Sequence, residues 1–181
     1  MTVARDVEAL IRRAMSAQRR ARPQEALRLL QAALARGGEI GDAASLVMTL
    51  RALALWHIER GAAGTALACY RSAVDIARGA DDELVLAHAV RHLADAHRRR
   101  QELEAAEPLY AEAISIYRRH IGVAPLPLAD ALRGAARLME ASGAAAQAAP
   151  LWREAETLYR QSGLREGVEQ ARSALERCRN P

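Results

Sequence analysis

Residues 94–113 read ADAHRRRQELEAAEPLYAEA, and they repeat the pattern of residues 54–73, ALWHIERGAAGTALACYRSA. In both stretches alanine stands at the first, thirteenth and twentieth positions, and tyrosine stands at the seventeenth. Alanine lets two helix backbones approach closely without losing rotamer freedom, and a bulky residue between two alanines fills the space beside the contact. The spacing therefore predicts two amphipathic helices packed as a hairpin.

The same positions are filled four times along the chain. The starting alanine recurs, at intervals of 40, 40 and 42 residues, as Ala14, Ala54, Ala94 and Ala136. The bulky position is occupied in turn by Leu30, Tyr70, Tyr110 and Trp152. A fixed period of this length is typical of arrays in which each hairpin buries its apolar face against its neighbours. We therefore predict an all-α solenoid.

Turn and breaker residues set the expected boundaries. The predicted first helices of the hairpins span residues 6–21, 43–60, 82–99 and 127–142. The predicted second helices span residues 23–36, 63–78, 102–120 and 145–161. We expect breakers between hairpins at Gly37-Gly38 with Gly41-Asp42, at 79–82 and at 122–127. A ninth helix over 165–178 would cap the open end, so residues 1–181 form one domain in this interpretation.

The repeat resembles the tetratricopeptide repeat family over nearly the whole chain. The residues that carry the resemblance include Leu50, Leu53-Ala54, Gly61, Ala66, Tyr70, Ala73, Leu93-Ala94, Ala106, Ala113, Gly143, Ala148, Trp152 and Ala155. The segments 106–110 and 149–152, each with a proline, look like the longer kinesin-light-chain type of repeat. The first hairpin departs most, with Ala21 where glycine is usual. The resemblance implies a right-handed superhelix, with the first helices lining a concave groove and with proteins or peptides as partners.

Composition narrows the function. The chain has 181 residues and a formal charge of +4; all 26 of its basic residues are arginine, and no apolar run approaches the length of a membrane span. Its beginning lacks a basic stretch followed by an apolar one, and Cys69 and Cys178 lack metal-type spacing. We expect a cytoplasmic protein that binds no membrane and no cofactor. No motif of an enzyme is visible, so we expect no catalysis.

The geometry implied by the resemblance places one stripe of each first helix in the groove. The charged residues expected there are Arg51, Arg91, Arg98, Arg133 and Arg137. The apolar residues expected there are Ile11, Met15, Leu55 and Ile58. Arginine grips carboxylates with a planar fork, so this surface predicts a partner segment that combines acidic and apolar residues. Alternatively, these arginines pair within their own helices, as Arg91–Asp95, Asp130–Arg133 and Arg137–Glu140.

Three other functions compete with this interpretation. His88, His92 and Asp95 share one helical stripe and form a low-probability metal site. Arg98-Arg99-Arg100 suggests nucleic acid, but the few aromatic residues fall mostly in packing positions, so we regard nucleic acid as unlikely. Incomplete cover by the ninth helix would let the C-terminal hairpins form a homodimer, which makes a purely architectural module the main alternative. Clamping of a chaperone C-terminus is disfavoured because the chain lacks lysine and has Asn180 as its sole asparagine.

Overall fold

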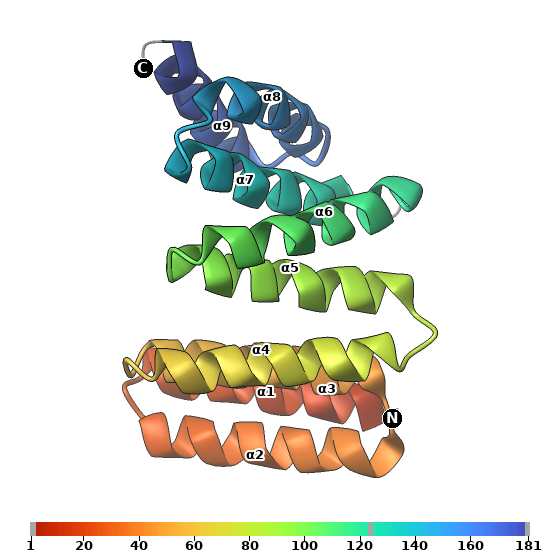
Figure 1. The fold of residues 1–181 in the computed structure, drawn as a ribbon. Helices are drawn as coiled ribbons and strands as arrows, with labels where there is room; N and C mark the ends of the chain where they lie inside the picture. The colour runs from red at the N-terminus through yellow and green to blue at the C-terminus, as the bar shows by residue number, and fades with distance from the viewer. Residues whose placement is uncertain (1–2, 123–124, 180–181) are drawn as a thin grey trace. The chain divides into compact units, whose positions relative to one another are not determined.

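The structure, a computed structural model, describes residues 3–122 and 125–179, and their regular structure is entirely helical (Figure 1). The helices are α1 (Val3–Arg19), α2 (Pro23–Ile40), α3 (Ala43–Ile58), α4 (Ala63–Arg78), α5 (Glu83–Arg99), α6 (Leu103–Arg119), α7 (Pro125–Ala141), α8 (Ala145–Gln161) and α9 (Arg165–Arg179). Within each unit, neighbouring helices pack against one another as in a helical-repeat solenoid, which confirms the predicted fold class. The chain divides into two compact units, residues 1–89 and 90–181.

In the first unit, α1 packs on α2, α2 on α3 and α3 on α4, while α1 also contacts α3. The small positions that the repeat predicts are inaccessible to solvent, as Ala14, Ala26, Ala33 and Ala54 show. Leu30, in the bulky position, is equally buried. The indole Nε1 of Trp56 donates to the carbonyl oxygen of Pro23 at 3.2 Å, which ties α3 to the first turn of α2. The hairpin positions thus act as the repeat pattern predicts.

In the second unit, α6 packs on α7, α7 on α8 and α8 on α9. A core cluster formed by α7, α8 and α9 contains Ala136, Ala148, Trp152, Ala171 and Ala174. The predicted ninth helix is therefore present, and it covers the apolar surface of α7 and α8. Among the described residues of this unit, Ile121, Leu126 and Leu164 are the large apolar residues that remain exposed.

Of the predicted breaker, the part at Gly37-Gly38 is wrong, whereas the part at Gly41-Asp42 is confirmed. Helix α2 continues to Ile40 and ends at Gly41, whose φ of +64° is left-handed. Gly37 is buried against α3, where a Cβ atom would lie 3.1 Å from Cδ2 of Leu46. The glycine therefore serves a close helix contact and does not break the helix. Helix α7 likewise begins earlier than predicted, at Pro125; within the predicted breaker 122–127, residues 123 and 124 lie outside the described residues.

All four hairpins turn at the same position of the repeat. Ala21, Gly61, Gln101 and Gly143 stand seven residues after their starting alanines and have φ values of +55°, +73°, +62° and +80°. The following amide donates back to the carbonyl five residues earlier, as Arg22 does to Ala17 at 2.9 Å. This is the left-handed helix end at which glycine is preferred, because other residues suffer a steric contact of Cβ there.

Replacing Ala21 or Gln101 by glycine should therefore stabilise the protein. The left-handed conformation costs a non-glycine residue about 1–2 kcal/mol, which glycine avoids. The greater freedom of glycine in the unfolded chain offsets about 0.4–1 kcal/mol of that gain. We expect each substitution to raise the free energy of unfolding by about 0.5–1 kcal/mol, measured by urea titration. Ala111→Gly, at an exposed site inside α6, is the control and should lose about 1 kcal/mol. Equal losses at positions 21 and 111 would contradict the interpretation.

Candidate functional site

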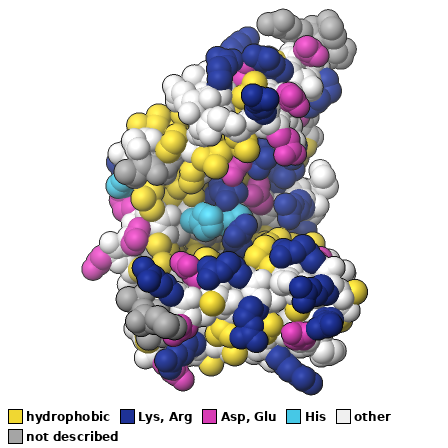
Figure 2. Space-filling view, turned by 180° about the vertical axis from the view of Figure 1, so that it is seen from behind, with side chains coloured by type: hydrophobic (Ala, Val, Ile, Leu, Met, Phe, Trp, Pro, Cys, Tyr) yellow, Lys and Arg dark blue, Asp and Glu magenta, His cyan; other side chains and the backbone are white. Residues whose placement is uncertain are grey.

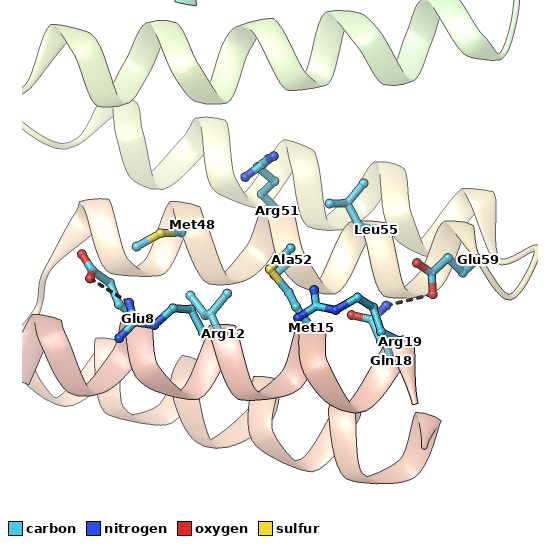
Figure 3. A pocket seen from close by; sticks show the side chains of 11 residues that line it. Glu8, Arg12, Met15, Gln18, Arg19, Met48, Arg51, Ala52, Leu55 and Glu59 are labelled. Atoms are coloured by element: carbon cyan, nitrogen blue, oxygen red, sulfur yellow. Dashed lines mark hydrogen bonds and ion pairs between the residues drawn. The ribbon is translucent and has the colours of Figure 1, made fainter. Parts of the chain in front are cut away.

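A pocket of about 430 Å³ lies between α1 and α3 of the first unit (Figure 3). Its floor and walls are formed by Ile11, Met15, Met48, Arg51, Ala52 and Leu55. Met15 is 45% exposed although it is apolar, and Figure 3 shows that it reaches from α1 towards Ala52 of α3. The pocket exists because α1 and α3 are the first helices of adjacent hairpins and contact each other only lightly along this face. An accessible apolar side chain inside a concave surface is what a binding site for an apolar group requires.

Charged side chains surround this pocket. They are Glu8, Arg12, Arg19 and Glu59, together with Arg51 from the wall, and the neutral Gln18 lies among them. Arg12 Nη1 lies 3.3 Å from Glu8 Oε2, and Gln18 Nε2 donates to Glu59 Oε2 at 2.9 Å. Three arginines against two glutamates leave one positive charge in excess at the rim. In the lower part of Figure 2, arginine side chains and hydrophobic side chains alternate over the face of the first unit.

The predicted groove residues of the first unit are largely brought together. Ile11, Met15, Arg51 and Leu55 all line the pocket, whereas Ile58 is 36% exposed and is not part of the lining. Ile58 stands one turn nearer the end of α3, where the pocket closes at Glu59. The rim residues Glu8, Arg12 and Arg19 were missed, because the prediction followed single stripes and not the wider face that a pocket between two helices exposes.

In the second unit, the charged groove residues of α5 and α7 are called the inner row. They are Arg91, Asp95, Arg98, Asp130, Arg133, Arg137 and Glu140, and most of them form a network with aromatic hydrogen-bond donors. Asp95 accepts from the Tyr110 hydroxyl at 2.6 Å and from Arg91 Nη1 at 3.2 Å. Arg91 is only 7% exposed, and its Nη2 lies 2.9 Å from His92 Nε2. Arg98 Nε donates to the Tyr110 hydroxyl at 3.1 Å. Arg91 thus pairs with Asp95 of its own helix, as the alternative interpretation predicts.

The next repeat forms a similar network. Asp130 accepts from the Tyr159 hydroxyl at 2.8 Å and lies 3.0 Å from Arg133 Nη2, so the predicted pair Asp130–Arg133 is present. Both Tyr110 and Tyr159 are buried, and burial together with the neighbouring carboxylate raises the pKa of each hydroxyl far above its usual value. The two tyrosines therefore remain neutral donors at any physiological pH, and their hydrogen bonds orient the two aspartates.

The predicted pair Arg137–Glu140 is not formed. The Glu140 Oε1 atom accepts instead from the Trp152 indole Nε1 at 2.9 Å. In the preceding repeat, the position equivalent to Glu140 holds Arg98, which donates to the hydroxyl of Tyr110. An indole nitrogen can only donate, so Trp152 in the same bulky position needs an acceptor there instead, and Glu140 provides it. Among the described residues no carboxylate lies within ion-pair distance of Arg137.

The metal and nucleic-acid alternatives find no support in the geometry. Within residues 3–122 and 125–179 no three His, Cys, Asp or Glu side chains are arranged to hold a metal ion, and Asp95 of the predicted set is occupied by Tyr110 and Arg91. Tyr110, Trp152 and Tyr159 are at most 1% exposed, so they cannot stack on bases. In the part of the chain that is described, no helix combines the length and the apolar character that crossing a bilayer demands.

Comparison with known proteins identifies the repeat. The tetratricopeptide repeat profile matches residues 6–79 and again residues 86–125, which together make up more than half of the chain. No curated protein sequence matches the chain.

Solved structures share the fold at low sequence identity. The TPR-like repeats of a candidate kinesin light chain from Podosopora anserina align over 99% of this chain and 97% of their own, with a TM-score of 0.68 and 16% identity. BtubC (BKLC) from P. vanneervenii aligns over 98% and 81%, with a TM-score of 0.65 and 20% identity. The signal transduction ATPase with a tetratricopeptide repeat sensor from Pyrococcus horikoshii aligns over 97% of this chain and 27% of its own, with a TM-score of 0.77 and 13% identity. The predicted resemblance is confirmed, and the chain belongs to the tetratricopeptide repeat family.

Proposed function

We propose that this protein is a non-enzymatic cytoplasmic adaptor whose α1–α3 pocket binds a peptide segment of a partner protein. Repeats of this family are generally protein–protein interaction modules, which supports the coarse assignment. The observation that carries the finer one is the pocket of about 430 Å³ in which an exposed Met15 lies beside Ile11 and Leu55. Its chemistry suits one apolar side chain of the partner.

The rim determines the sequence around that side chain. With one positive charge in excess, it favours acidic residues on either side of the apolar anchor. Burying one large apolar side chain contributes about 1.5–3 kcal/mol, and each hydrogen bond to a charged group about 1.5–3 kcal/mol. One anchor and two such bonds are consistent with a micromolar complex, which corresponds to about −8 kcal/mol.

The architectural alternative rests on weaker ground. A homodimer through the C-terminal hairpins requires apolar surface that α9 leaves uncovered. Trp152, Leu158 and Tyr159 are at most 5% exposed, and the large apolar residues left exposed in the described part of the second unit, Ile121, Leu126 and Leu164, are single side chains spaced along the chain. The adaptor is the better supported function.

The test uses synthetic peptides of defined composition. One set places Leu, Met or Trp between Asp and Glu residues, a second set replaces the acidic residues by Lys, and a third replaces the apolar residue by Gly. We expect the first set alone to bind wild type with micromolar affinity in a fluorescence anisotropy titration. Met15→Asp and Arg51→Glu should each weaken this binding at least about tenfold, which is about 1.4 kcal/mol.

The matched control is Ile40→Asp. Ile40 is 39% exposed at the end of α2, outside the pocket, so this variant adds the same charge to a comparable apolar site. Its peptide affinity should equal that of wild type, and far-UV circular dichroism should show all three variants folded. If Met15→Asp binds the acidic–apolar peptides as tightly as Ile40→Asp does, the pocket is not the binding site.

A further inference from the structure

The carboxylates on the inner row of α5 and α7 are each engaged by an aromatic donor of the following helix. Asp95 is held by Tyr110 at 2.6 Å, Asp130 by Tyr159 at 2.8 Å and Glu140 by Trp152 at 2.9 Å. Asp95 and Asp130 also have an arginine within their own helices. The negative charges of the row are thus satisfied by the protein itself.

The positive charges of the row are not balanced in the same way. Arg137 is half-buried, and within the described residues it makes no hydrogen bond and no ion pair. Burial is the largest cause of the lowered pKa of Arg137, the nearby guanidinium groups of Arg133 and Arg98 lower it further, and the Glu140 carboxylate, which lies beyond ion-pair distance, opposes them more weakly. A partly desolvated charge beside like charges is unfavourable unless a counter-ion is supplied. Among the described residues, none supplies an anion in direct contact with Arg137, so the guanidinium is open to an anion from outside the chain.

Gly134 brings these arginines together. It stands on α7 between Arg133 and Arg137, and a Cβ atom there would lie 2.7 Å from the Tyr110 hydroxyl oxygen. That hydroxyl accepts from Arg98 Nε at 3.1 Å, so the absence of a side chain on Gly134 lets Arg98 of α5 approach α7 at the height of Arg137. Arg98 and Arg133 have 19% and 31% of their side chains exposed, which leaves the cluster accessible from solvent.

We propose that Arg98, Arg133 and Arg137 form an oxyanion site in the second unit, with Arg137 as the residue that binds the anion directly. Planar guanidinium forks match carboxylate and phosphate oxygens alike, so the ligand is an oxyanion carried by an acidic side chain of a partner or a free inorganic ion. Arg98 keeps its contact to Tyr110, and Arg133 keeps its contact to Asp130. Both attract the anion electrostatically without binding it directly. The site is separate from the α1–α3 pocket and does not depend on the function proposed for it.

Thermal unfolding at constant ionic strength tests the site without any partner. One arm replaces sodium chloride by sodium phosphate, and a second adds a blocked pentaglutamate peptide. At about tenfold excess over Kd, either ligand should raise the Tm of wild type by about 3–6 °C. A rise with phosphate but not with pentaglutamate identifies a site for a free ion, and a rise with the peptide at lower concentration identifies a site for an acidic side chain.

Variants assign the effect to Arg137. Arg137→Gln should abolish the ligand-dependent rise, and Arg137→Lys, which keeps the charge on a flexible stem, should keep about half of it. Arg99→Gln removes an exposed arginine at the end of α5 and should respond as wild type does. Met15→Asp should also respond as wild type, so failure of the oxyanion site and failure of the peptide pocket are distinguishable. The proposal is overturned if neither ligand raises the Tm of wild type, or if Arg137→Gln and Arg137→Lys both retain the full rise.

Discussion

Trp152→Ala is expected to cost about 3–5 kcal/mol of the free energy of unfolding, measured by urea titration followed by far-UV circular dichroism. Trp152 is inaccessible to solvent, and it lies in the cluster that joins α7, α8 and α9. The surrounding residues include Ala136, Ala148, Ala171 and Ala174, whose short side chains cannot extend into the space that the indole vacates. The substitution therefore leaves a cavity that Met139 and Leu175, which pack at the edge of the cluster, refill only in part.

A second variant separates the volume of the ring from its hydrogen bond. Trp152→Phe keeps an aromatic ring but removes the indole Nε1 that donates to Glu140. Because Glu140 is partly exposed, water can replace part of that bond, and we expect a loss of about 1–2 kcal/mol. Leu151 directly precedes Trp152 in α8 and is partly buried. Leu151→Ala therefore measures the stability lost when a side chain is shortened at the edge of the cluster. A loss for Trp152→Ala no larger than that for Leu151→Ala would contradict the assigned role of Trp152 at the centre of the cluster.

The positions that repeat with the hairpin could be predicted from sequence because one physical requirement recurs at each of them. A backbone contact between two helices requires alanine at Ala94 and Ala106 for the same reason that it does at Ala54 and Ala66, so four occurrences in register fix the helices. Ala94 and Ala106 are inaccessible to solvent in the structure. A turn position is harder to recognise when it holds Ala21 or Gln101, yet the register still places it.

The side-chain network of the second unit could not be predicted in this way. The expected pair Arg137–Glu140 followed from helical spacing, which considers neighbours on one helix only. The partner that Glu140 has in the structure, Trp152, comes from the next helix and was assigned to packing alone. Pairings between helices depend on the distance and rotation of one helix relative to another, and the spacing of residues along one chain segment does not contain them.

Glycine inside a helix is the other feature whose meaning depends on neighbours. Gly37 and Gly38 were predicted to break a helix, whereas both lie within α2. Gly37 faces Leu46 closely, and nothing lies within 4 Å of the position where a Cβ of Gly38 would stand. Helix-breaking propensity is about 1 kcal/mol per glycine, which the packing of an amphipathic helix readily outweighs.

Gly134→Ala is expected to destabilise the protein by about 1–3 kcal/mol, although alanine is the better helix former. A Cβ atom at this position would lie 2.4 Å from Cε1 of the Tyr110 ring, and all three of its nearest atoms belong to that ring or its hydroxyl. Tyr110 cannot move aside, because it is 1% exposed and its hydroxyl is held by Asp95 and Arg98. The clash therefore forces α6 and α7 apart or breaks the hydrogen bonds of the inner row.

Gly38→Ala is the matched control, since Gly38 is also inside a helix but has open space at the Cβ position. This substitution should stabilise the protein by about 0.5–1 kcal/mol through helix propensity alone. Opposite signs for the two glycines in the same urea titration are the expected result. Combining Gly134→Ala with Tyr110→Leu should recover part of the loss, because the smaller side chain leaves room for the methyl group, and residues in contact show coupling of about 0.5–3 kcal/mol in such a cycle. If the double variant loses as much free energy of unfolding as the two single variants together, the close approach of Tyr110 to Gly134 does not account for the loss. The placement of Arg98 beside Arg137, which depends on that approach, would then be contradicted as well.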